Sequence, residues 1–211
     1  QRMTAKLGLQ VGNTAGGDII VDGISATHSG TVIPTVTLTA TNSDAQVLFS
    51  IGASEFHELM VQADAGITVS VSLDTSGAAL HLDGDSNNSA DGATKHNTVT
   101  FAHLKAVTAA TILTLETGTV RMEALGKLTL AATAGVYIAD DLMGQQNDMI
   151  LTIDANTDTD TDGILTVVTG KTVTSNKSDI TITAWDFDMD GSLTAGDETL
   201  SVTSDAVANT A

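Results

Sequence analysis

A run of alternating aspartates near the C-terminal end has the spacing best suited to binding a metal ion. It combines four acidic residues with two hydroxyl residues: Asp186, Asp188, Asp190, Ser192, Thr194 and Asp197. With Gly191 at the sixth position, these residues match the ligand positions of an EF-hand-like calcium loop. The spacing therefore predicts a calcium site. The alternative is a strand that points Phe187 and Met189 inward and leaves the aspartates in water.

A second acidic ladder lies upstream of this run. Its members alternate with threonines, and they are Asp154, Asn156, Asp158, Asp160 and Asp162. A shorter copy is formed by Asp83, Asp85, Asn87 and Asp91. Because every residue between Asn156 and Asp162 is polar, we expect an exposed loop there. This loop is a weaker candidate for calcium, and a solvated acidic turn is the alternative.

Other catalytic or cofactor-binding patterns are missing from the sequence. The five histidines have no zinc-site spacing, and there is no nucleophile elbow, phosphate-binding loop or dinucleotide fingerprint. A polysaccharide lyase built on a β-helix would need a basic residue near the sugar. The chain has only two arginines, Arg2 and Arg121, and its lysines are scattered. We therefore expect a protein that is not an enzyme, with a lyase as the less favoured alternative.

Composition limits the partners and the core. Of the 211 residues, 26 are acidic and 8 basic, for a net charge of −18, which argues against binding nucleic acid or an anionic membrane surface. The chain has no cysteine, and no apolar run approaches the length of a membrane helix. Hydrophobic residues make up 42% but aromatic residues only 3%, so the core must consist of thin layers of small aliphatic side chains.

Short strands separated by Gly, Asn, Asp and Ser turns are expected along most of the chain. The expected strands are 35–41, 46–51, 58–63, 67–73, 79–83, 98–104, 111–116, 120–123, 127–132, 136–139, 149–154, 164–168, 172–174, 180–184 and 199–202. Residues 102–110 and 139–149 are the only segments with helical character. Residues 1–34 are irregular, with one or two strands, and form either a cap or a strand donated to a neighbouring subunit. Residues 35–211 form the repetitive domain.

Internal repeats indicate a solenoid. Residues 80–92 align with 151–163, residues 59–66 with 128–135, and residues 112–118 with 164–170, at offsets of 71, 69 and 52. Several coexisting offsets imply a shorter unit of about 14–22 residues, one strand plus a turn. The pattern favours an all-β chain folded as a right-handed parallel β-helix. One or two antiparallel β-sandwich domains are the alternative.

The most regular segment, 149–205, resembles the degenerate repeats of filamentous-haemagglutinin-like bacterial surface proteins. The matching residues include Gly170, Thr172, Val173, Ser175 and Asn176, followed by Asp179 to Ala184 and by the Asp186–Gly196 run. The resemblance is weaker over 58–135. It implies a secreted, elongated β-solenoid of an adhesin or a matrix protein, with no catalytic residues to carry over.

Together these features predict a non-enzymatic structural protein that is secreted, extracellular or on the cell surface. We expect a subunit or segment of a filament, surface layer or adhesin that self-associates into a homo-oligomer or homopolymer and is stabilised by calcium. A calcium-dependent module that binds cell-surface glycans is the alternative. No insertion into a membrane is expected.

Overall fold

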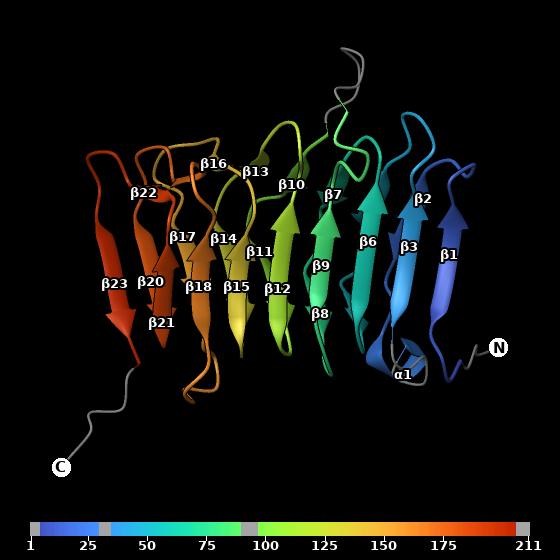
Figure 1. Cartoon of the computed structure of the whole chain (residues 1–211), viewed down its shortest axis with the longest axis horizontal. Coiled ribbons are helices and arrows are strands. Elements are labelled where there is room, and N and C mark those ends of the chain that lie inside the picture. Colours follow the sequence, from blue (N-terminus) through green and yellow to red (C-terminus); the bar gives the residue numbers. More distant parts are fainter. Residues whose placement is uncertain (1–4, 30–34, 90–96, 206–211) are drawn as a thin grey trace.

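Three parallel β-sheets wind around one interior and form a parallel β-helix (Figure 1). The structure is a computed structural model that describes residues 5–29, 35–89 and 97–205. The predicted all-β solenoid is confirmed, and the alternative of antiparallel sandwich domains is wrong, because every strand pair is parallel. Asp91 and His96 lie outside the described residues.

The strands of each sheet follow one another along the solenoid axis. The first sheet contains β1 (Leu9–Asn13), β3 (Val36–Ala40), β6 (Leu59–Ala63), β9 (Leu80–Asp83), β12 (Ile112–Glu116), β15 (Gly135–Ile138), β18 (Ile164–Val167) and β21 (Asp186–Met189). The second contains β2 (Ile19–Asp22), β4 (Val47–Ser50), β7 (Ile67–Val69), β10 (Val99–Phe101), β13 (Met122–Ala124), β16 (Leu142–Gly144), β19 (Thr172–Thr174) and β22 (Ser192–Thr194). The third contains β5 (Ser54–Phe56), β8 (Leu73–Thr75), β11 (Lys105–Ala109), β14 (Leu128–Ala132), β17 (Leu151–Asp154), β20 (Ile180–Ala184) and β23 (Leu200–Ser204).

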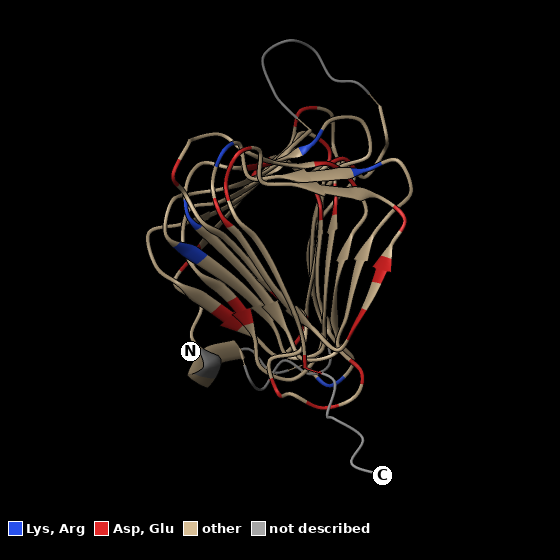
Figure 2. Cartoon of the chain, turned by 90° about the vertical axis from the view of Figure 1, so that its left-hand side faces the viewer, with Lys and Arg blue, Asp and Glu red and all other residues tan. Residues whose placement is uncertain are grey.

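Each full coil takes one strand from the first, second and third sheets in that order. We call the turn between the first and second sheets the first corner, the turn between the second and third sheets the second corner, and the turn that leads back to the first sheet the third corner. Figure 2 shows the three sheets around the interior and many of the Asp and Glu residues at the corners. The corners therefore carry much of the polar chemistry of the molecule.

The core is built from aliphatic residues that stack in register from coil to coil. In the first sheet, Leu82 pairs with Leu115 and Leu115 with Ile138, and all three side chains are fully buried. In the third sheet, Leu130, Ile153 and Ile182 form an equivalent row. Since side chains alternate between the two faces of a strand, one apolar residue in two is enough to fill this narrow interior.

The repeat unit differs from the predicted one. Leu59 pairs with Leu80, 21 residues later, and Leu80 pairs with Leu113, 33 residues later, so one coil of three strands is the unit. The offset of 52 is a true structural repeat, because Ile112 and Ile164 both pair with Gly135. The offsets of 69 and 71 align strands of the first sheet with strands of the third. They match two similar strand-and-turn patterns on different faces of the solenoid.

Both predicted helical segments are wrong. Residues 105–109 form β11 and residues 142–144 form β16, each paired in its sheet on both sides. Sequence reasoning also merged β7 with β8 and overlooked β5 and β22 as strands. These strands have only three residues each, which is too short for a periodic pattern to be recognised.

The N-terminal residues belong to the same solenoid. Strand β1 pairs with β3, and β2 pairs with β4, over their full lengths. The third position of this first coil is taken by α1 (Ala26–Ser29), which lies against β5. The Glu55 amide donates to the Ile24 carbonyl oxygen (2.7 Å), and the Ser29 hydroxyl donates to the Glu55 carbonyl oxygen (2.5 Å). The edge of the third sheet is therefore covered at this end.

The stacked core makes a first prediction. Replacing Leu115 with alanine removes a fully buried side chain between Leu82 and Ile138, and we expect the unfolding free energy to fall by about 3 kcal/mol. The neighbouring Thr114 points outward, so Thr114→Ala should cost less than about 1 kcal/mol. Urea unfolding followed by circular dichroism measures both. Equal costs for the two variants would contradict the inward assignment of Leu115.

Candidate functional site

The first predicted calcium site does not form a loop. Asp186 and Asp188 lie on β21, where they point outward and are exposed, while Phe187 and Met189 are half-buried against the core. The strand pairs with β18, which fixes this alternation. The sequence alternative of a strand with outward aspartates therefore describes the backbone of 186–189.

The remaining residues of this run are spread over a turn and a second strand. Asp190 accepts a hydrogen bond from the Thr169 hydroxyl (3.2 Å), and the hydroxyl of Ser192 bonds that of Thr172 (2.9 Å). Thr194 ends β22 in the second sheet, and Asp197 lies in the turn that follows it. The structure does not bring these side chains together with Asp186 and Asp188. An EF-hand-like arrangement is therefore absent from 186–197.

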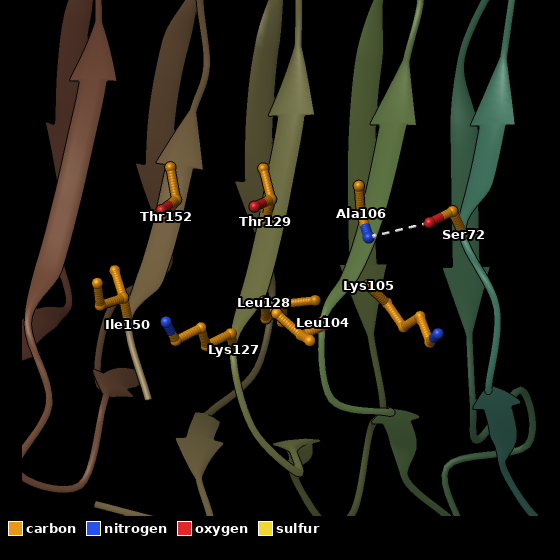
Figure 3. A pocket seen from close by; sticks show the side chains of 9 residues that line it. All are labelled: Ser72, Leu104, Lys105, Ala106, Lys127, Leu128, Thr129, Ile150 and Thr152. Atoms are coloured by element: carbon orange, nitrogen blue, oxygen red, sulfur yellow. Dashed lines mark hydrogen bonds between the residues drawn. The ribbon is translucent and has the colours of Figure 1, made fainter. Parts of the chain in front are cut away.

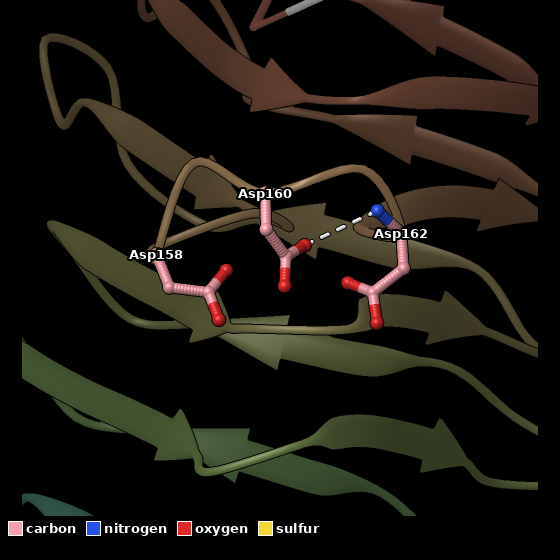
Figure 4. A group of neighbouring side chains, drawn as sticks. All are labelled: Asp158, Asp160 and Asp162. Atoms are coloured by element: carbon pink, nitrogen blue, oxygen red, sulfur yellow. Dashed lines mark hydrogen bonds between the residues drawn. The ribbon is translucent and has the colours of Figure 1, made fainter.

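In the second acidic ladder, the weaker candidate, three carboxylates do lie close together. Asp158, Asp160 and Asp162 each place one carboxylate oxygen within 4.8 Å of the others, and all three are exposed (Figure 4). They occupy the third corner between β17 and β18, and within the described residues no other three carboxylate, imidazole or thiol groups come so close. A hydrogen bond with Asp160 is the main cause that raises the pKa of Asp162, and repulsion from Asp158 and Asp160 adds to it.

The other two members of this ladder support the loop from within. Asp154 ends β17 and accepts a hydrogen bond from the Asn156 amide (3.2 Å). Asn156 is buried, and its side-chain nitrogen donates to the Asp160 carbonyl oxygen (3.2 Å). Ca²⁺ takes about six to eight oxygen ligands. Three carboxylates on such a loop supply fewer, so water molecules would have to complete the coordination shell. The geometry suits a weak site.

Buried aspartates at the first corner bind neighbouring coils to one another. Asp140 accepts hydrogen bonds from the amides of Thr117 (2.9 Å) and Gly118 (3.0 Å) in the preceding coil. Its other oxygen pairs with the ammonium group of Lys171 in the following coil. This hydrogen bond is the main cause that raises the pKa of Lys171. One carboxylate thus joins three coils and is itself fully satisfied despite its burial.

Asp64 and Asp85 also accept hydrogen bonds from neighbouring coils at the first corner. Asp64 accepts from the Asp44 amide (2.8 Å) and from the side chain of Asn87, which lie in the coils on either side. Asp85 accepts from the Thr119 amide (3.0 Å) and from the Thr119 hydroxyl in the next coil. Asp85 and Asn87 of the shorter acidic copy are therefore bonded to neighbouring coils rather than gathered with Asp83 in one exposed group.

A carboxylate pair lies on the outer face of the first sheet. Asp83 pairs in register with Glu116 and is only 8% exposed. Burial is the main cause that raises the pKa of Asp83 to about 6, and the charge of Glu116 adds to it, while the Asp85 amide acts in the opposite direction. His81 lies two residues before Asp83 on β9, and its Nε2 atom is 3.5 Å from the Glu116 carboxylate.

The C-terminal end of the solenoid exposes apolar residues and strand edges. Strands β21, β22 and β23 each have a partner on one side only among the described residues. Leu200 and Val202 of β23 are 42% and 49% exposed, although Ile180 and Ile182 beside them in the same rows are fully buried. The core rows therefore reach this end without a covering layer in the part of the chain that the structure describes.

Comparisons with known protein families, with curated proteins and with solved structures find no match for this chain. Among the described residues no helix is long and apolar enough to cross a membrane. The geometry of the site therefore carries the functional argument alone.

The raised pKa of Asp83 predicts a pH-dependent stability. Because the folded pKa of about 6 lies above the ordinary value of 3.8, the protonated form of Asp83 favours the fold; this stability is complete below about pH 4 and is lost as the pH rises through 6. Asp83→Asn should therefore stabilise the protein at pH 8, by on the order of 2 kcal/mol, and the gain should shrink towards pH 4. Thermal unfolding across this pH range measures it. Glu198→Gln removes the same charge from an exposed turn and should show no such trend.

The aspartate group predicts a weak response to calcium. At millimolar calcium, the range of weak extracellular sites, we expect the unfolding midpoint to rise by about 2–4 °C. Asp160→Asn should remove this rise, because Asp160 lies between the other two carboxylates. Asp188→Asn should keep it. The opposite result, loss with Asp188→Asn alone, would place the metal on the 186–197 run instead.

Proposed function

We propose that this chain is a structural segment of a secreted or cell-surface β-solenoid assembly, a filament, surface layer or adhesin, whose copies associate end to end. The single observation that carries the proposal is that, in the part of the chain that the structure describes, strand edges and apolar rows stay uncovered at both ends of the solenoid. Unpaired edges are templates for association with another strand, and proteins that stay monomeric normally cover them.

The two ends are compatible in their side chains. If β21 of one copy continues onto β1 of the next, Phe187 and Met189 fall in the same inward rows as Leu9 and Val11. The outward position between them would place Asp188 beside Gln10, which carries no charge. Each joined row would gain an apolar neighbour, and the backbone ladder of the first sheet would run on without interruption.

The second and third sheets contribute unequally to such a joint. Leu193 of β22 and Ile19 of β2 are both half-buried against the core and both end a row. In the third sheet the edge of β5 is covered by α1, so β23 would meet the segment of Ile24–Ser29 instead of a free strand. The joint would therefore rest on two continuous sheets and one packed contact.

Charge sets the conditions for this association. A net charge of −18 makes copies repel one another, and salt or divalent cations weaken that repulsion. The aspartate group at the third corner adds a place where calcium would neutralise part of the charge. A role outside the cell rests on the repeat pattern of 149–205 and on this preference for a salty, calcium-containing medium.

End-to-end association predicts that blocking the last strand prevents assembly. Leu200→Lys with Val202→Lys places two charges on the open end of the core, and we expect the concentration needed for assembly to rise at least about tenfold, one unit of 1.4 kcal/mol. Sedimentation and electron microscopy of the full chain, with and without calcium, measure particle length. Met60→Lys changes an exposed apolar residue in the middle of the solenoid and serves as the control.

The proposal fails if the unmodified chain stays monomeric at high concentration with calcium. It also fails if the doubly charged variant assembles as readily as the Met60→Lys control.

A further inference from the structure

A groove of about 310 Å³ runs along the second corner of the solenoid, parallel to its axis (Figure 3). It spans four successive coils, from Ser72 before β8 through Leu104 and Lys127 to Ile150 before β17. The corners are tied together at its centre, where the Leu104 amide donates to the Lys127 carbonyl oxygen (2.9 Å). The groove is therefore a fixed surface of the fold.

The groove concentrates positive charge on an acidic molecule. Lys105 and Lys127, two of only eight Lys and Arg residues in the chain, line it from adjacent coils. No ion pair of either lysine is found within the described residues, whereas Arg121 and Lys171 do pair with carboxylates. Their ammonium groups lie on the two sides of Leu104 (Figure 3). Two unpaired cations at a concave surface favour an anionic ligand.

The groove also carries exposed apolar side chains, Leu104 between the two lysines and Ile150 beyond Lys127 (Figure 3). Leu104 is 65% exposed and Ile150 39% exposed. Leu104 has a φ of 58°, and Asp148 and Asn176 have similar values at the same corner of later coils. The corner thus explains the backbone conformation. The corner does not account for an exposed leucine at position 104, because Asn and Asp adopt a positive φ more readily than leucine does.

Hydroxyl groups complete the lining. Thr129 and Thr152 pair in register on the outward face of the third sheet, about 4.8 Å apart along the axis. The Ser72 hydroxyl lies at the far end and accepts a hydrogen bond from the Ala106 amide (3.4 Å). The groove therefore offers cations, hydroxyl groups and exposed apolar side chains along four successive coils.

From this lining we infer that the groove binds an acidic polysaccharide, one whose sugar units carry carboxylates. The lysines would pair with the carboxylates, the threonines with sugar hydroxyls, and Leu104 and Ile150 would contact the C–H face of a sugar ring. A linear polymer matches a groove that runs along four successive coils and places cations on two of them and hydroxyl groups on three.

Other polyanions fit this groove less well. An acidic peptide normally gains affinity by adding a strand to a free sheet edge, but β8, β11, β14 and β17 are each paired on both sides. A single-stranded nucleic acid would need aromatic side chains for its bases to stack on, and none of the residues that line the groove is aromatic. A polysaccharide needs only the side-chain contacts that the groove provides.

The test uses the full chain and polygalacturonate oligomers, with isothermal titration calorimetry as the readout. Lys105→Gln with Lys127→Gln should weaken binding at least about tenfold, the loss expected for charge-assisted hydrogen bonds. Leu104→Asn keeps a residue that accepts a positive φ and should also weaken binding, because it removes the apolar contact. Lys6→Gln removes one exposed lysine outside the groove and should bind like the parent chain.

Thermal unfolding of each variant checks that the fold is kept. Absence of saturable binding by the parent chain overturns the inference, as does unchanged binding by the doubly substituted variant. Equal competition by polyglutamate would show that charge alone is recognised and would also overturn it. The inference does not rest on end-to-end association, so the double variant Leu200→Lys, Val202→Lys should bind the oligomers normally.

Discussion

Parallel backbone pairing between successive coils decides which side chains of this molecule meet. Once Leu82, Leu115 and Ile138 are in register on the first sheet, every second residue of these strands must fill the interior and the others must face water. A slip by one residue would move a whole row to the wrong face. The interior is filled mostly by Val, Ile, Leu and Ala, and its largest fully buried side chains are Phe49 and Phe101.

The strands stay in register although the coils differ in length, and hydrogen bonds at the first corner help to hold them there. The coils vary because the corners, not the strands, take up the extra residues. Asp64, Asp85 and Asp140 each accept backbone or side-chain hydrogen bonds from a neighbouring coil at this corner. Gly118 belongs to the same arrangement, since a side chain there would collide with Asn88. Part of the acidic composition is thus structural, and it would be misjudged as metal-binding from composition alone.

The sequence was sufficient for the fold class because the alternation is strong in the longer strands. Strands 172–174 and 180–184 were predicted with the observed bounds, and residues 35–41 and 58–63 came within a residue or two. The pattern was insufficient where a strand has three residues, as in β5, or where alanine-rich segments such as 105–109 imitate a helix. There the pairing with neighbouring coils outweighs local propensity.

The predicted metal sites also show what could be inferred from the sequence and what depends on strand pairing. An Asp-x-Asp-x-Asp spacing fits both a calcium loop and the outer face of a strand, so only the pairing of β21 with β18 distinguishes them. Residues 155–162 of the second ladder have no strand partner, and three of their carboxylates could come together. The groove had no sequence signal, because Lys105 and Lys127 come together only through the coil register.

A solenoid of this kind separates two sorts of surface by its geometry. Within 5–29, 35–89 and 97–205, every interior strand is paired on both sides, and unpaired strand edges lie at the two ends of the solenoid. Along the faces and corners, a ligand would contact side chains, which lie in rows along the solenoid axis. Association through strands must therefore use the ends, and recognition along the length must use rows such as Thr129 and Thr152. The two proposed activities are compatible on one chain because neither would occupy the surface that the other requires.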